Sequence, residues 1–233
     1  MAVSGSNLTV GSSATDATSY NTASVSPTSN NLVLVSVANS LSGTPTTPSL
    51  SGNGLTYVQV NTVVYDASGT QRRLTTFRAL GASPSAGAIT ISFGATTQLN
   101  CIWVVDQFSG VDTSGTNGSG AVVQSATNSA TSAPSALTVT LAAFGSANNA
   151  TYGSFSWNDN ANTATPGTGF SELNEHQQAT EQISIQSQWR ADNDTSVDVS
   201  LTGATGEIGG IAVEIKAATA TVFHMLPILG VGQ

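Results

Sequence analysis

The run Asn31-Leu-Val-Leu-Val-Ser-Val-Ala38 carries the pattern on which the fold prediction rests. Side chains of a strand point alternately to its two faces, so a period of two predicts a half-buried β-strand. Turn-forming residues, such as those at 51–54, separate this run from others of the same kind. Further strands of this pattern are expected at 55–60, 88–93, 136–141, 182–189 and 196–201.

Helical patterns are nearly absent from the chain. No segment keeps an apolar period of 3.6 residues over three turns, so little helix is expected. The prediction is therefore an all-β fold, an antiparallel β-sandwich with jelly-roll-like connections.

The two halves of the chain share short blocks in the same order, which indicates a pseudo-repeat of about 20–112 and 121–216. The halves can form two tandem sandwiches or one sandwich in which each contributes a Greek key. We favour a single domain over 1–216, because the connector at 112–120 is short and each half alone would have a thin core. The matched blocks are 30–37 with 148–155, 52–56 with 167–171, 77–79 with 189–191, 89–96 with 197–205 and 102–108 with 211–215.

The composition excludes several classes of function. Only 8% of the 233 residues are charged, and five Lys and Arg against 13 Asp and Glu give a formal charge of -8. No basic patch can therefore neutralise nucleic acid or an anionic membrane, and we expect neither as a partner. Ser and Thr make up roughly a quarter of the chain, which predicts an uncharged, hydroxyl-rich surface. The apolar residues lie in short runs, none of them long enough for a transmembrane helix.

The N-terminal residues show no basic stretch followed by an apolar run, so no secretory signal is expected in this sequence. Cys101, the one cysteine, lies in an apolar strand-like run. We interpret it as a buried, inert thiol that forms no intramolecular disulfide.

Three short motifs, Phe108-Ser-Gly-Val-Asp112, Gly54-Leu-Thr-Tyr57 and Phe77-Arg-Ala79, make residues 28–217 similar to a loosely defined family of phage-encoded and bacterial extracellular β-sandwich domains. The resemblance implies a jelly-roll-like fold without an assigned catalytic activity. The chain differs from the family in its N-terminal residues, which lack a signal peptide, and in an added apolar tail. Both differences favour the phage-virion version over the secreted bacterial one.

Residues with catalytic or metal-binding potential are few and poorly spaced. His176 and His224 lie in unrelated contexts without a zinc-binding motif. Glu172, Glu175 and Glu181 can supply the carboxylate pair of a glycan hydrolase or lyase, but solvated strand ends look the same. We therefore expect no catalytic residue, no metal site and no cofactor, and we predict that the protein is not an enzyme.

Aromatic residues near strand ends are candidates for stacking against a glycan. Trp103 lies within an apolar strand and is expected in the core, whereas other aromatic residues can face either way. The candidates for glycan stacking are Tyr152, Trp157 and Trp189.

The tail, residues 217–233, is apolar and carries few charges, so in water it would promote aggregation. We expect it to be buried against a neighbouring subunit. The basic pair at 72–73 is interpreted either as a salt bridge at a hairpin end or as a contact between subunits. The predicted subunit interface thus comprises Arg72, Arg73, Val222, Phe223, Met225, Leu226, Ile228 and Leu229.

These observations predict a non-enzymatic structural protein of a virion, a capsid decoration (cement) protein or a related surface subunit. Its partners would be other copies of itself and a capsid or particle protein, at a virion surface assembled in the host cytoplasm. Few charges suit a dense array, because neighbouring copies repel each other less. The alternatives are a self-assembling extracellular filament subunit and a carbohydrate-binding or adhesion module, with the glycan hydrolase the weakest.

Overall fold

The computed structural model describes residues 2–65 and 69–219, which form seventeen β-strands and contain no helix. All strand pairs are antiparallel, as the pairing of β1 (Ser4–Ser13) with β9 (Asn100–Ser109) illustrates. The predicted all-β antiparallel sandwich architecture is therefore confirmed. No helix long and apolar enough to cross a membrane occurs in the part of the chain that the structure describes.

The first part of the chain forms two sheets. The first inner sheet has five strands, in the order β1, β9, β3 (Leu32–Ser42), β7 (Thr70–Ala79) and β6 (Val58–Val64). The first outer sheet consists of β2 (Ser19–Asn21), β8 (Thr90–Ser92), β4 (Ser49–Gly52) and β5 (Leu55–Thr56).

The second part of the chain forms two more sheets. The second inner sheet has five strands, in the order β10 (Val122–Thr131), β17 (Glu207–Ile215), β12 (Ala150–Trp157), β15 (Ile183–Arg190) and β14 (Ser171–Gln178). The second outer sheet consists of β11 (Ala136–Thr140), β16 (Ser196–Leu201) and β13 (Ala164–Pro166).

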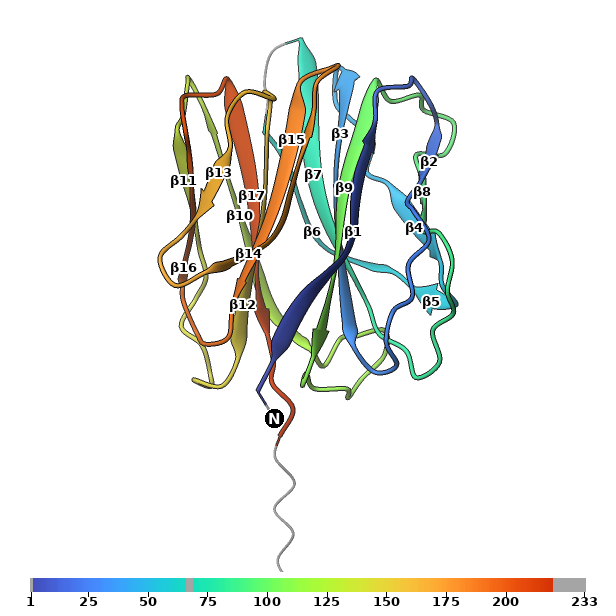
Figure 1. Ribbon diagram of the computed structural model, residues 1–233, viewed down its shortest axis with the longest axis vertical. Coiled ribbons are helices and arrows are strands. Elements are labelled where there is room, and N and C mark those ends of the chain that lie inside the picture. The colour runs from blue at the N-terminus through green and yellow to red at the C-terminus, as the bar shows by residue number, and fades with distance from the viewer. Residues whose placement is uncertain (1, 66–68, 220–233) are drawn as a thin grey trace, which may run out of the picture.

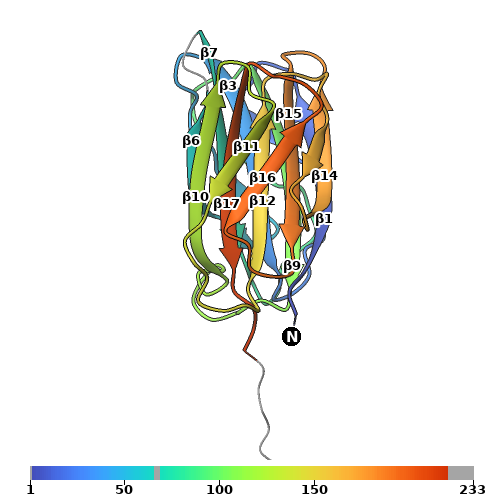
Figure 2. The same cartoon turned by 90° about the vertical axis from the view of Figure 1, so that its left-hand side faces the viewer.

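The four sheets lie in four layers, with the two inner sheets packed against each other in the middle (Figures 1 and 2). Side chains of both inner sheets, among them Leu34 and Ile211, share the central core. A second core, with Phe77 and Ile91, joins the first inner and outer sheets, and a third, with Phe155 and Val199, joins the second pair. Each half of the chain therefore builds its own pair of sheets, and the two pairs pack together through the central core.

Strands of the inner sheets are buried on both faces. All but the last two residues of β3 are buried, and so is the whole of β12. The half-buried pattern expected for 31–38 was therefore wrong in detail, because each inner sheet is covered by an outer sheet on one face and by its counterpart on the other. In the outer sheets, by contrast, β11 and β16 alternate between buried and exposed residues as predicted.

Both inner sheets follow the same strand order. In each, the first strand of that part of the chain forms one edge, and the last strand lies beside it (β1 with β9, β10 with β17). The edges of the two sheets also meet: Asn174 of β14 donates to Asn7 Oδ1 of β1 at 3.1 Å, and Asn61 of β6 donates to Ser125 Oγ of β10 at 3.1 Å. Side chains thus link the exposed edges of one inner sheet to the other.

The chain leaves β17 at the same end of the molecule as its first described residues (Figure 1). Ala218 N donates to Gly110 O at 2.8 Å, and Ala217 forms a bridge with Val111. Residues 216–218 are therefore held along the connection between β9 and β10.

Candidate functional site: a groove beside the end of β17

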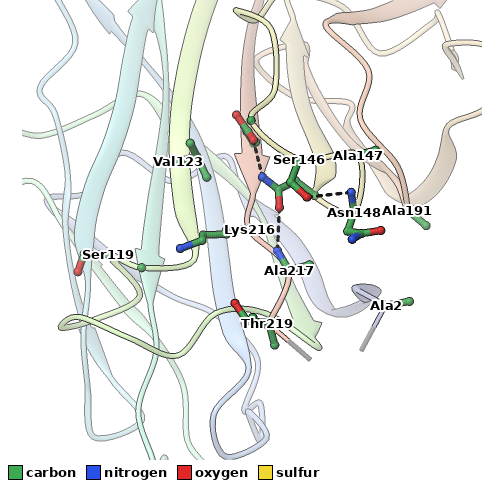
Figure 3. Close-up of a pocket in the computed structure, with 15 residues that line it drawn as sticks. Ala2, Ser119, Val123, Ser146, Ala147, Asn148, Ala191, Lys216, Ala217 and Thr219 are labelled. Carbon is green, nitrogen blue, oxygen red and sulfur yellow. Dashed lines mark hydrogen bonds between the residues drawn. The ribbon is translucent and has the colours of Figure 1, made fainter. Parts of the chain in front are cut away.

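A groove with a volume of about 930 Å³ opens at the end of the second inner sheet where the chain leaves β17 (Figure 3). Glu214 in its floor lies on the same face of β17 as Ala212 and Ile208, which pack against the second outer sheet. The groove therefore lies on the outer face of the inner sheet, beyond the end of the three-stranded sheet that covers the rest of that face. Its walls come from the start of β10, the 145–149 loop and the segment that follows β17.

The floor is a fully buried carboxylate whose two oxygens are both occupied. Asn149 Nδ2 donates to Glu214 Oε1 at 2.6 Å, and Gln124 Nε2 donates to Glu214 Oε2 at 2.6 Å. Asn149 Oδ1 accepts a hydrogen bond of 3.2 Å from Ala217 N, so the floor also fixes the chain after β17 (Figure 3). With its acceptors already satisfied, the carboxylate has a positioning role for the loop and the strand ends.

The walls consist mainly of small residues around one larger apolar side chain. Val123, at 50% exposure, is the one large hydrophobic residue that is exposed among those the structure describes. Ala147 and Ala191 lie on the other side of the groove from Val123, and polar side chains such as Asn148 and Thr219 also line it (Figure 3). The exposed Val123 and the small residues of the lining favour a ligand that brings apolar side chains and can also pair with the polar groups of the walls.

Lys216 lines the groove, but it forms its ion pair with Asp112, which is not part of the floor. Its Nζ lies 2.7 Å from Asp112 Oδ2. Hydrogen bonds from Lys216 and Ser114 lower the pKa of Asp112 to about 2. The pair ties the end of β17 to the β9–β10 connection.

A second polar cluster lies in the central core, between the inner sheets. Asp106 is fully buried there, where Asn7 Nδ2 donates to its Oδ1 at 2.8 Å and Tyr152 Oη donates to its Oδ2 at 3.1 Å. Ser36 Oγ lies 3.1 Å from the same Tyr152 hydroxyl and 2.9 Å from Thr76 Oγ1. Burial raises the pKa of Asp106 to about 6, although the hydrogen bonds to its carboxylate oppose that shift.

The structure removes two of the three candidates for glycan stacking. Tyr152 and Trp157 are fully buried, so neither can reach a sugar, and that interpretation was wrong for both. Trp189 is half-buried and packs edge-on against Phe108, with ring centroids 6.1 Å apart. Trp103 is buried in the core, as expected.

Arg72 and Arg73 both have partners within the chain. Arg72 Nη1 lies 3.6 Å from Glu207 Oε2 across the two inner sheets. Arg73 Nε donates to Pro45 O at 2.8 Å, and its Nη1 donates to Thr62 Oγ1 at 3.0 Å. Both guanidinium groups thus stabilise the fold within one chain, and we infer no contact between subunits from them.

The carboxylates considered for glycan hydrolysis lie near the edge of the second inner sheet. Glu175 accepts hydrogen bonds of 2.8 Å from Ala164 N and from Gln177 Nε2, and burial raises its pKa. Glu172 lies on the same strand, whereas Glu181 lies in the following turn. The oxygens of Glu175 are thus used in joining β14 to β13.

Metal ligands do not gather in the described residues. No group of three or more His, Cys, Asp and Glu side chains that could hold a metal ion occurs within residues 2–65 and 69–219. His176 Nε2 lies 3.1 Å from Ser12 Oγ, joining β14 to β1, and burial lowers its pKa.

Part of the predicted interface lies outside the described residues. This applies to the tail residues Val222, Phe223, Met225, Leu226, Ile228 and Leu229, and His224, considered above as a metal ligand, also lies outside them. Sequence analysis did not identify the groove residues, because Val123 and Asn149 come from separate loops and strand ends and share no motif. Comparison with protein-family models, curated proteins and solved structures gives no match to this chain.

Proposed function

We propose that this protein is a non-enzymatic structural subunit of a virion, a capsid decoration (cement) protein or a related surface subunit. Its partners are other copies of itself and a capsid or particle protein, and its place is the virion surface, after assembly in the host cytoplasm. The assignment to a virion rests on the sequence resemblance.

One observation carries the structural part of the proposal: the features suited to attachment lie at one end of the molecule. The groove, its exposed Val123 and the last described residue, Thr219, all belong to that end. The apolar stretch at 220–233 follows directly in the sequence. A subunit built this way attaches through one end and leaves its sheets projecting, as a decoration protein does.

The architecture supports a further part of the proposal, that the chain is a jelly-roll-like sandwich built from two related halves. The strand orders of the two inner sheets correspond, and the matched sequence blocks at 89–96 and 197–205 contain β8 and all but the first residue of β16. The central core joins both halves, which favours one domain over 1–216.

The uncharged surface suits crowding of many copies. Residues exposed on the outer sheets, such as Thr138, Thr140 and Ser200, carry hydroxyl groups in place of charges. Contacts made by such groups are hydrogen bonds, which salt does not screen as it screens ion pairs.

The mass of the protein in solution tests the structural proposal. The full chain should assemble, and a chain ending at Thr219 should be a folded monomer when both are measured by light scattering at equal concentration. The truncation keeps 217–219, because Ala217 N and Ala218 N donate to Asn149 and Gly110. Two monomers of equal stability would refute a role of the tail in assembly.

Two further measurements separate the related proposals. A closed, point-symmetric oligomer supports a particle subunit, whereas an open polymer supports the extracellular filament subunit. Antibodies against the protein should label the outside of intact particles from the source culture, and unlabelled particles would contradict the virion assignment.

A further inference from the structure

We propose that the groove beside β17 binds the apolar tail segment 222–226 of a second copy of this chain. The proposal rests on the structural role proposed above and specifies the contact through which two subunits join. It concerns how the copies bind each other, so it can be tested without knowing the particle.

The tail segment consists mainly of large apolar residues, which suit the groove. Residues 222–226 read Val-Phe-His-Met-Leu, with four large apolar side chains and no Lys, Arg, Asp or Glu. Such a segment gains free energy when it leaves water, at about 25 cal/mol for each Å² of apolar surface that is buried. It therefore needs an apolar surface to cover it.

The groove complements these large side chains with small ones. Alanine, glycine and serine form most of its walls, and they leave a volume of about 930 Å³ above a floor whose carboxylate is already hydrogen-bonded. Val123 stands half exposed in the wall, where nothing within the described chain covers it fully. Large apolar side chains can fill the space between these small ones, and the Asn148 and Thr219 side chains in the walls can pair with polar backbone groups of the segment.

The direction of the chain assigns the tail to a second copy. Hydrogen bonds from Ala217 and Ala218 hold the chain in line with β17, heading away from the sheets (Figure 1). Because Lys216 and Ala217 line the groove, residues 222–226 of the same chain could pack against them only by folding back within a few residues of Thr219. No Gly, Pro, Asn, Asp or Ser occurs between 217 and 226, so the residues that favour such a reversal are missing.

The reach of the tail is sufficient for exchange. An extended segment covers roughly 3.3 Å per residue, so the seven residues 220–226 span about 23 Å. Because the groove and the start of the tail lie at the same end, two copies that meet end to end can place each tail in the other's groove. Such a contact is isologous and closes as a two-fold dimer.

Disulfide trapping between two full-length populations tests the exchange. One population carries Ala147→Cys in the groove wall, and the other carries Met225→Cys in the tail and an affinity tag. The native Cys101 does not interfere, because it is fully buried and its pKa is raised. After mixing and mild oxidation, we expect a cross-linked dimer that contains one tagged and one untagged chain.

A matched control places the cysteine on the outer sheet. Position 140 is exposed on β11 and does not line the groove, so Thr140→Cys should give no cross-link with Met225→Cys. Equal cross-linking to position 140 would overturn the proposal. A chain that carries both Ala147→Cys and Met225→Cys and closes as a cross-linked monomer would also overturn it, since the tail would then occupy its own groove.

A charge in the groove gives a second, independent readout. Val123→Asp should raise the dimer dissociation constant by at least about tenfold, since a carboxylate would be buried against apolar side chains. Thr140→Asp adds the same charge to an exposed position and should leave the dissociation constant unchanged. Equal constants for wild type and Val123→Asp, measured by sedimentation, would refute the docking site.

The outcomes distinguish this inference from the proposed function. If particles carry the protein but no mixed dimer forms, the structural role stands and the docking site is refuted. If the mixed dimer forms and particles lack the protein, the docking site stands and the virion assignment is refuted.

Discussion

Replacing Asp106 by Asn should make the stability of the protein less dependent on pH. Asp106 is fully buried between the inner sheets, and its pKa is raised from an ordinary 3.8 to about 6. The folded protein therefore holds the proton more tightly than the unfolded chain does. The contribution of Asp106 to stability is therefore fully present at and below about pH 4, and it is lost as the pH rises through about 6.

The size of the effect follows from the shift. A difference of about two pKa units, at about 1.36 kcal/mol each, gives about 3 kcal/mol of stability lost between pH 4 and pH 7. Asp106→Asn removes this titration and keeps a side chain of the same shape. Its amide can donate to the Tyr152 hydroxyl, which can in turn donate to Ser36 Oγ, already 3.1 Å away.

Urea unfolding of wild type and Asp106→Asn, at intervals from pH 4 to pH 7.5, measures this contribution. Glu175 and His176 also titrate with shifted pKa values, but they are common to both proteins and cancel in the difference. The variant should become the more stable protein by up to about 3 kcal/mol near pH 7. A difference between the two free energies of unfolding that stays constant over this range would refute the assignment of a raised pKa to Asp106.

Three further predictions concern packing, reactivity and the end of β17. Gly210→Ala should lower the free energy of unfolding by about 1–3 kcal/mol, because an added Cβ would lie 2.7 Å from the Phe155 ring. In Gly145→Ala, the control, the added Cβ meets no atom within 4 Å, so the free energy of unfolding should change little. Urea unfolding measures both. Cys101 should resist thiol reagents until the protein unfolds, since burial raises its pKa, and rapid labelling of the native protein would contradict this. Asp112→Asn should destabilise the protein by less than about 1 kcal/mol at pH 7, and the difference from wild type should vanish as the pH falls through about 2, where the wild-type carboxylate loses its charge.

Local patterns predicted the outer strands and the class of the fold. Strands β11 and β16 alternate because one of their faces is in water, which is the situation that a period of two describes. The burial of Cys101 and Trp103 followed from the apolar run around them. These features depend on neighbours in sequence, and the sequence alone was sufficient for them.

Features that depend on distant parts of the chain were not predicted. β1, β10 and β14 are rich in Ser, Asn, Thr and Gln, and they form edges whose polar side chains bond to the opposite inner sheet. Tyr152 was taken for a possible glycan ligand, but its hydroxyl is buried with Asp106, 46 positions away in the sequence. Such pairings are created by the packing of the two halves, so no local pattern indicates them.

The groove depends on how one loop crosses the end of an inner sheet. In the first half, the loop after β2 inserts Val25, at 4% exposure, into the outer core, and Thr28 N donates to Gln107 Oε1 of β9. In the second half, the loop before β12 holds Asn149 against Glu214 instead and leaves Val123 half exposed. Since both halves share a strand order, the sheets alone do not create the groove. The binding surface is therefore a property of one loop, and exchanging that loop for its counterpart would change the surface while keeping the sheets.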